Sequence, residues 1–167
     1  FEIFDDNVNN AHPLKGLGRV KMSNLCTEIL QLQTTSNITD MDVPNEYGLD
    51  VSCNLGSLDI HKATQSEDFE ELVDTSMQLL TNVSEMTYIK NVPSVAKANE
   101  LMHSVGLGVM NLHGHLVQSN LLYGSDESIQ FIDYFMEALN FYSLKASMEI
   151  AKKKNKTFYG FEHSEYA

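Results

Sequence analysis

The sequence has few basic residues beside its acidic ones, and it has no long apolar run. Lys and Arg total 11 against 23 Asp and Glu, which gives a formal net charge of -12. This balance argues against a nucleic-acid-binding surface, because displacing the counterions of a phosphate backbone takes concentrated Lys and Arg. A nucleotide substrate remains compatible with it, since a few backbone N–H groups can hold one phosphate locally. No segment is apolar enough to span a bilayer.

Cysteine is scarce as well, with Cys26 and Cys53 as the whole supply. Two cysteines are too few for the disulfide framework of a small secreted protein. Because the sequence does not open with a signal peptide either, we expect a cytoplasmic location and no membrane partner. In a reducing compartment these two residues are either small buried hydrophobic side chains or reactive thiols.

The composition is that of one ordinary globular domain, with 43% hydrophobic and 20% charged residues over 167 positions. Both ends nevertheless resemble cuts in a longer sequence. Phe1-Glu2-Ile3-Phe4 is typical of a strand already under way, and Tyr166-Ala167 follows an aromatic-rich stretch without a polar tail. We therefore expect a segment of a larger protein.

The first third of the sequence mixes turns with short extended segments. Residues 5–18 are rich in Asn, Asp and Gly, which predicts turns and a loop. Residues 28–32 alternate apolar with polar side chains and could form a strand or a helical turn, while residues 34–48 are polar and predict a surface loop. Residues 51–60 alternate around Gly56, which predicts an extended segment whose backbone is closely approached.

Two helices are predicted in the middle of the sequence. The first covers about 67–88, where Thr64 and Glu67 have capping-box spacing at its start. The second runs over 94–116, because its apolar residues recur at steps of three and four. Gly106 and Gly108 each weaken that second helix by about 1 kcal/mol relative to Ala. A break in the helix near them therefore stays an open alternative.

A third helix is predicted from Ser125, a good N-cap, to Lys154. Asp126 and Glu127 suit the positive end of its dipole, and the lysines at its far end suit the negative end. Its buried stripe is expected to consist of Ile129, Ile132, Phe135, Leu139, Tyr142, Ala146 and Ile150. Three helices with few extended segments predict an α/β piece whose sheet is completed from outside this chain.

The densest group of reactive side chains is Ser23-Asn24-Leu25-Cys26-Thr27-Glu28. In an extended or finger-like loop, residues two apart face the same way, so Asn24, Cys26 and Glu28 would point into one site. An amide, a thiol and a carboxylate together suit chemistry on a hydroxylated substrate. The carboxylate can take a hydroxyl proton while the sulfur acts on the adjacent carbon.

Other readings of the cysteines are weaker. A Cys/His nucleophile needs a base that lowers the pKa of the thiol, whereas Glu28 would raise the pKa of Cys26. None of the six histidines lies close in sequence, although a histidine close in space stays an open alternative. A zinc site is disfavoured because Cys26 and Cys53 lack Cys-x-x-Cys spacing. Either cysteine could also be a buried structural thiol.

Several other residues are expected to have no chemical role. His103, His113 and His115 are predicted to be core or surface residues rather than metal ligands, so we expect no metal site. The lysines of 152–156 are predicted to be a solvated helix end. Gly106 lacks the preceding strand of a dinucleotide-binding loop. Packing on helices is expected of Met102, Met110, Met136 and Met148.

Several segments, in matching order, resemble the large (α) subunit of class I ribonucleotide reductases. Residues 23–29 resemble its Asn-x-Cys-x-Glu active-site loop, and residues 51–58 (VSCNLGSL) resemble the later segment that holds one redox-active cysteine. Val92-Pro93-Ser94 and residues 106–114 (GLGVMNLHG) are also similar to the family. The wording is closest to the bacterial and phage Ib branch, and the resemblance covers nearly the whole chain. A lone Asn-x-Cys-x-Glu would be weak; the ordered set is strong.

The resemblance implies a helix-rich segment of a ten-stranded α/β barrel, with Cys26 at the tip of an active-site finger loop. As a thiyl radical, Cys26 would remove the 3′ hydrogen of a ribonucleoside diphosphate. Glu28 would accept the 3′-hydroxyl proton, and Asn24 would hydrogen-bond the ribose. Leu25 and Thr27 would lend backbone to the substrate pocket. Such a site must be dry, because solvent would quench a sulfur radical.

The resemblance also implies partners. Cys53 would be one of two thiols that reduce the 2′ carbon, and a redoxin would reopen the resulting disulfide. The radical would come from a metal-containing β subunit, so this chain itself would bind no cofactor. Effector nucleotides, ATP or a deoxynucleoside triphosphate, would bind outside it.

Residues 1–167 would then be a partial catalytic barrel domain. The family's second reducing cysteine, its N-terminal effector region, its phosphate loop and its radical-relaying tyrosine pair have no counterpart here. We therefore expect part of a split, intein-interrupted or truncated α subunit that is inactive without its remaining segments. The alternative, from another functional class, is a non-catalytic acidic helical interaction module or an inactive remnant.

Overall fold

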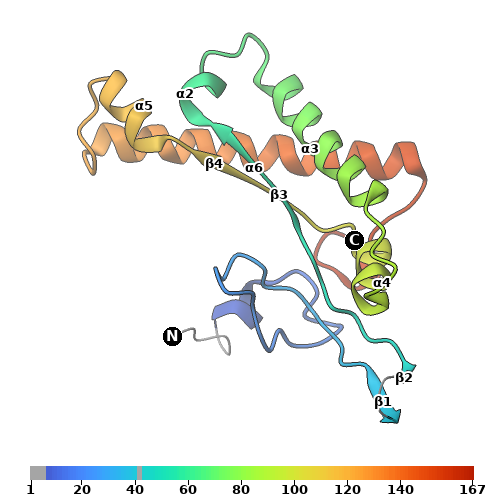
Figure 1. Cartoon of the computed structure of the whole chain (residues 1–167). Coiled ribbons are helices and arrows are strands. Elements are labelled where there is room, and N and C mark those ends of the chain that lie inside the picture. Colours follow the sequence, from blue (N-terminus) through green and yellow to red (C-terminus); the bar gives the residue numbers. More distant parts are fainter. Residues whose placement is uncertain (1–6, 41–42) are drawn as a thin grey trace. The chain divides into compact units, whose positions relative to one another are not determined.

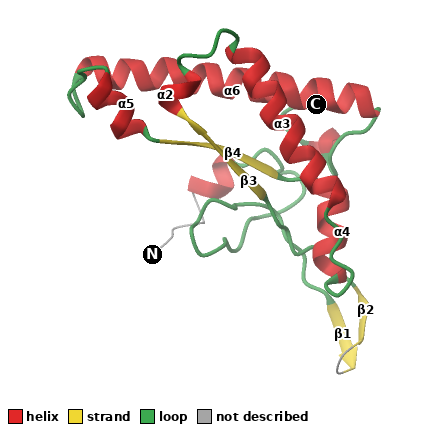
Figure 2. Ribbon diagram, turned by 45° about the horizontal axis from the view of Figure 1, so that its top comes forward, coloured by secondary structure: helices red, strands yellow, loops and turns green. Residues whose placement is uncertain are grey.

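The computed structural model describes residues 7–40 and 43–167, which combine helices with short strands (Figures 1 and 2). The strand expected at Phe1–Phe4 lies outside the described residues. None of the helices in the described ranges is both long and apolar enough to cross a membrane. The mixed α/β class expected from the sequence is confirmed.

The chain forms two compact units, each assembled from separate stretches of sequence. The first unit comprises Phe1–Cys53, Ser84–Ser104 and Thr157–Ala167, and the second comprises Asn54–Val83 and Val105–Lys156. The described residues contain two two-stranded sheets and no closed barrel. The expected barrel is therefore not formed within the described part of this chain.

The second unit is built around two parallel strands, β3 (Asn54–Asp59) and β4 (Val105–Met110), which Figure 2 shows side by side. Each strand leads directly into a short helix, β3 into α2 (Ile60–Ala63) and β4 into α5 (Leu112–Gln118). The extended segment predicted near residues 51–60 is confirmed.

The single helix predicted over 94–116 is wrong. The chain forms α4 (Pro93–Met102), then β4, then α5. The reason lies in the alternation of Val105, Leu107 and Val109, whose side chains pack against the core, with glycines between them. Apolar residues two apart favour a strand, and glycine disfavours a helix.

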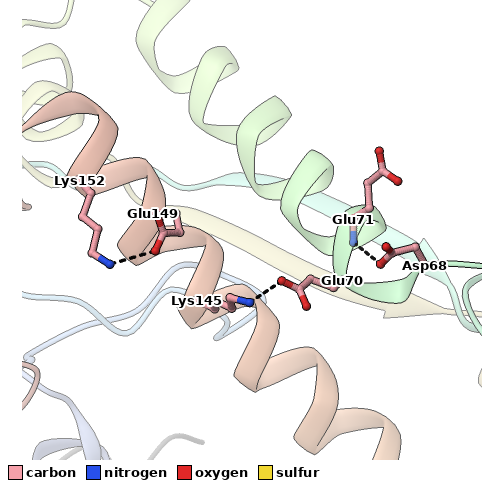
Figure 3. Close-up of polar contacts among 6 residues, drawn as sticks. All are labelled: Asp68, Glu70, Glu71, Lys145, Glu149 and Lys152. Carbon is pink, nitrogen blue, oxygen red and sulfur yellow. Dashed lines mark hydrogen bonds and ion pairs between the residues drawn. The ribbon is translucent and has the colours of Figure 1, made fainter.

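Two long helices provide most of the second unit's core, α3 (Phe69–Met86) and α6 (Asp126–Lys154), the latter coloured orange to red in Figure 1. The buried cluster consists of Ile60, Ala63, Val73, Met77, Phe135, Leu139 and Ala146. An exposed ion pair joins the helices, where Lys145 Nζ lies 2.5 Å from Glu70 Oε1 (Figure 3). Exposed pairs of this kind add little stability, so the apolar cluster holds α3 to α6.

The start of α6 is confirmed, because the Ser125 hydroxyl oxygen accepts the Ser128 N–H at its first turn. The capping box predicted for α3 is wrong. Asp68 Oδ1 accepts the Glu71 N–H at 2.9 Å (Figure 3), whereas Thr64 ends α2. Because Thr64 belongs to the end of α2, α3 begins only at Phe69, after both residues of the predicted capping box.

The predicted buried stripe of α6 is confirmed at Phe135, Leu139 and Ala146, and Tyr142 packs against the same cluster. Ile129 is an error, with 59% of its surface exposed. It lies six positions before Phe135, about 120° around a helix of 3.6 residues per turn, and so misses the core. The expected packing of Met110, Met136 and Met148 is also wrong, since all three are exposed.

The first unit has more loop than regular structure. Residues 34–48 do not form a plain loop but hold an antiparallel hairpin, β1 (Asn37–Asp40) and β2 (Val43–Glu46). Residues 28–32 form neither a strand nor a helical turn. Short helices occur at α1 (Asn9–Ala11) and η2 (Phe161–His163).

Candidate active site

The loop that carries Cys26 is tied down ahead of the cysteine. The buried Asn9 side chain accepts the Val20 N–H at 2.7 Å and donates to the Val20 carbonyl at 3.1 Å. The Asn9 side chain thus satisfies both backbone groups of Val20, which is itself buried. Val20 is therefore held in place before the turn that carries Cys26.

A tight turn places Cys26 at an exposed tip. The Thr27 N–H donates to the Asn24 carbonyl at 3.1 Å, and Leu25 and Cys26 occupy the two central positions. Leu25 is fully exposed and Cys26 is exposed as a free thiol. Thr27 has φ 66°, a left-handed conformation that costs a β-branched residue about 1–3 kcal/mol. Strained residues of this kind cluster at functional sites.

Asn24 stabilises this turn with its own side chain. Its Oδ1 accepts the Ile29 N–H at 2.9 Å, and the Ser23 hydroxyl donates to its carbonyl at 2.9 Å. The chain reverses between Asn24 and Thr27, so the alternation of an extended segment does not apply. Asn24 Oδ1 is thus engaged by the backbone beyond Cys26.

Glu28 and Cys53 are brought together by the fold although they are 25 positions apart. Cys53 is half-buried just before β3, and burial raises its pKa; the nearby Glu28 carboxylate raises the pKa further. Both effects disfavour the thiolate. Cys53 is therefore held as a protonated thiol at neutral pH, which suits a hydrogen donor better than a nucleophile.

The segment before Cys53 is anchored by contacts that the sequence did not predict. The Ser94 hydroxyl donates to Asp50 Oδ2 at 2.5 Å, at the start of α4. Leu49 exchanges backbone hydrogen bonds with Thr34. Pro93 signals in the sequence where α4 begins, since proline favours the first position of a helix, but it does not indicate the bond to Asp50.

A buried polar pair also escaped the sequence reasoning. The Ser84 hydroxyl donates to Asn99 Oδ1 at 2.8 Å, and Asn99 Nδ2 donates back to the Ser84 carbonyl at 2.7 Å. It joins the end of α3 to α4, which bears Ser94. Helical periodicity predicts apolar contacts and gives no sign of such a pair.

A cavity of about 220 Å³ lies in the same unit, lined mainly by apolar side chains such as Leu30, Met102 and Phe158. His12 also lines it and is buried, and its Nε2 has no hydrogen-bond partner. Burial, followed by the nearby Lys15 charge, lowers the pKa of His12. A neutral imidazole is the form that such an apolar environment favours.

The histidines of the second unit differ in burial. His115 is buried and His113 is exposed. Among the described residues, no group of three or more His, Cys, Asp or Glu side chains could hold a metal ion.

Comparison with known proteins gives one consistent family. The family model described as "Ribonucleotide reductase, barrel domain" matches residues 1–167. The chain is 47% identical over 165 residues to the ribonucleoside-diphosphate reductase subunit alpha of Bacillus subtilis, covering 99% of this chain and 24% of that protein.

Two further relatives agree. The ribonucleoside-diphosphate reductase nrdEB subunit alpha of Bacillus phage SPbeta is 42% identical, over 99% of this chain and 15% of that protein. The subunit alpha of Mycoplasma pneumoniae is 42% identical over 99% of this chain and 23% of that protein. The chain thus spans less than a quarter of the length of each of these relatives.

Proposed function

The chain belongs to the ribonucleotide reductase family as a segment of its barrel domain, and from that membership we propose that it supplies part of the catalytic core of a ribonucleoside-diphosphate reductase α subunit. The proposed activity is the radical-based reduction of ribonucleotides to deoxyribonucleotides. It belongs to the assembled subunit, because this chain corresponds to 15–24% of its relatives.

In this proposal Cys26 carries the thiyl radical. Its sulfur takes the hydrogen from C3′ of a ribonucleoside diphosphate, forming an S–H bond and leaving the radical on the sugar. A protruding turn suits this task, because it carries one side chain into a pocket formed by other segments. Leu25 and Thr27 flank the thiol and present backbone to the substrate. The strain at Thr27 supports this role, since it fixes the tip.

Glu28 acts as the base that takes the 3′-hydroxyl proton from the sugar radical. Asn24 positions the ribose through its remaining hydrogen-bonding capacity. Its Oδ1 is engaged by Ile29, so its Nδ2 is the group that we assign to the ribose.

Cys53 and a second cysteine outside this chain reduce the 2′ carbon. The 2′-hydroxyl leaves as water, two thiol hydrogens are consumed and a disulfide forms. Glu28 then returns its proton to O3′ and the Cys26 thiol returns a hydrogen atom to C3′, which regenerates the thiyl radical. The raised pKa of Cys53 supports this role, because a protonated thiol holds the hydrogen that the step consumes.

The assembled enzyme takes its radical from a metal-containing β subunit and its electrons from a redoxin. Effector nucleotides bind to α-subunit segments other than this one. We place the protein in the cytoplasm, where the thiols of Cys26 and Cys53 stay reduced. The observation that carries the whole proposal is the match of the family model to residues 1–167, together with the strained turn that presents Cys26.

The test is a reductase assay that follows dCDP formed from CDP, with dithiothreitol, β subunit and ATP. We expect no turnover from this chain alone and turnover after the remaining α-subunit segments are added. In that mixture Cys26→Ser abolishes turnover and leaves assembly intact, while Ser23→Ala, a neighbour without assigned chemistry, keeps most of it. Retained turnover with Cys26→Ser contradicts the radical assignment. No turnover from a confirmed assembly favours the inactive-remnant alternative.

A further inference from the structure

Two histidines from different helices meet in the second unit, outside the candidate active site. His61 lies on α2 and His115 on α5, and their Nδ1 atoms are 3.2 Å apart. The helices follow the neighbouring parallel strands β3 and β4, so the contact ties together two elements at the same edge of the sheet.

The outer nitrogens of the two rings are also engaged. Gln65 Nε2 lies 3.1 Å from His61 Nε2, and Ser119 Oγ lies 3.4 Å from His115 Nε2. With the Gln65 amide nitrogen as the donor, His61 Nε2 accepts and the ring carries its proton on Nδ1. In that tautomer the proton points to His115 Nδ1, and His115 Nε2–H points to Ser119. The four side chains form one directional chain of hydrogen bonds, from Gln65 to Ser119.

The geometry suits a proton between the rings and not a metal ion. The ring centroids are 5.4 Å apart and the nitrogens 3.2 Å apart, a difference of 2.2 Å that is close to twice the radius of an imidazole ring. The two Nδ1 atoms therefore face each other almost head-on. A metal ion at their midpoint would lie 1.6 Å from each, half of 3.2 Å, whereas zinc needs about 2.0 Å.

The surroundings of His115 favour its neutral form. His115 is 7% exposed and stacks on Phe131 of α6, with centroids 4.4 Å apart. Burial lowers the pKa of His115, the nearby His61 lowers it further, and the Asp59 carboxylate at the end of β3 opposes both. Lys62 adds a positive charge on α2. On α5 the other histidine, His113, is exposed and lies against Tyr123.

We propose that His61 and His115 form a proton-sensitive latch between α2 and α5, closed with at most one extra proton and opened by the second. The first extra proton is tolerated because His61 Nδ1–H still donates to His115, and the Gln65 amide can turn to accept from His61 Nε2. With the second, both facing nitrogens carry hydrogens, with no acceptor between two positive rings. Mild acid thus releases α5 from α2, independently of the reductase chemistry.

The first experiment is an NMR titration of the histidine rings on the full chain. We expect the apparent pKa of His115 to rise in His61→Gln, since the substitution removes the neighbouring positive charge. His113→Gln is the matched control, from the same helix but outside the pair, and leaves His115 unchanged. The same response of His115 to both substitutions would overturn the proposal.

The second experiment measures opening through amide hydrogen exchange over Leu112–Gln118 at about pH 5 and about pH 7.5. Protection at the lower pH should fall about tenfold in the unsubstituted chain, because the second proton opens the latch. His61→Gln should retain its protection. His115→Phe, which keeps an aromatic ring against Phe131, should retain it too; if it fails to fold, His61→Gln alone decides. Equal loss of protection with and without His61 would refute the latch.

Discussion

At the scale of single residues, the candidate site depends on short-range hydrogen bonds that fix a few atoms. Asn24 accepts the Ile29 N–H and closes the turn that presents Cys26. Glu28, two positions beyond the thiol, instead acts on Cys53. Residues 23–28 thus affect both cysteines: the turn fixes the position of Cys26, and the Glu28 charge raises the pKa of Cys53.

Replacing Asn24 with Ala should therefore loosen the turn. The Ile29 N–H loses its acceptor, and a lost hydrogen bond of this kind costs about 1 kcal/mol of unfolding free energy. Urea unfolding measures the loss. Asn10→Ala, an exposed asparagine elsewhere in the same unit, is the control and should stay within about 0.5 kcal/mol. Equal effects of the two substitutions would show that the Asn24 bond does not hold the turn.

Replacing Glu28 with Gln should lower the pKa of Cys53, because the negative charge that disfavours the thiolate is removed. The pKa stays above the usual range, since burial is its larger cause. The measurement is the pH dependence of iodoacetamide alkylation in a Cys26→Ser background, where Cys53 is the remaining thiol. Glu46→Gln, an exposed carboxylate, should leave the profile unshifted. An unshifted profile with Glu28→Gln would show that the Glu28 charge does not affect the pKa of Cys53.

The pH dependence of stability should carry the signature of His115. Its pKa is lowered in the folded chain, so the unfolded state binds more protons as the pH falls below about 6.5. The contribution of His115 to the unfolding free energy should accordingly be fully present above that pH and decline below it. Chemical unfolding at several pH values, compared between the unsubstituted chain and His115→Phe, measures this decline. A parallel decline in both would assign it to His12, whose pKa is also lowered, or to the carboxylates instead.

At the scale of elements, helix ends explain what the sequence could and could not predict. The third helix was predictable because its signals are local: Ser125 caps it and three lysines close it. β4 was missed because Val105 and Val109 fit a helical spacing as well as an alternating one, and only pairing with β3 decides between them. β1 was missed because all four of its residues are exposed, which leaves no buried face to alternate with.

The site shows the same division. Its residue types and spacing predicted one site for Asn24, Cys26 and Glu28, and the family resemblance added Cys53, but the turn depends on where the Asn24 side chain bonds. The contact between Ser94 and Asp50 joins positions 44 apart, and local spacing carries no information about such a pair. Long-range hydrogen bonds are properties of the folded chain.

The revised start of α3 gives a direct test. Asp68→Ala should cost about 1 kcal/mol of unfolding free energy, the usual effect of removing an N-cap side chain. Glu67→Ala, next to it and part of the capping box expected from the sequence, should change stability by less than about 0.5 kcal/mol. Urea unfolding of both variants measures the difference. A larger loss of unfolding free energy from Glu67→Ala than from Asp68→Ala would support the capping box predicted from the sequence.

At the scale of the whole molecule, many large apolar side chains remain exposed. On α6 they include Tyr134, Phe141 and Leu144, and on α3 Leu79 and Met86. A soluble domain seldom exposes so many side chains of this kind along its long helices. In a chain that matches less than a quarter of its relatives, they are the surfaces that we expect the remaining α-subunit segments to cover.

This chain on its own should therefore self-associate through those helices. Phe141→Ser, at a side chain that is 61% exposed and outside the buried cluster, should weaken the association without lowering helix content. Sedimentation velocity over a range of concentrations measures the association, and circular dichroism measures the helix. Lys153→Ser, at the exposed end of the same helix, is the control and should associate like the unsubstituted chain. A chain that stays monomeric at every concentration would mean that these side chains tolerate water, and that the missing segments are not needed to cover them.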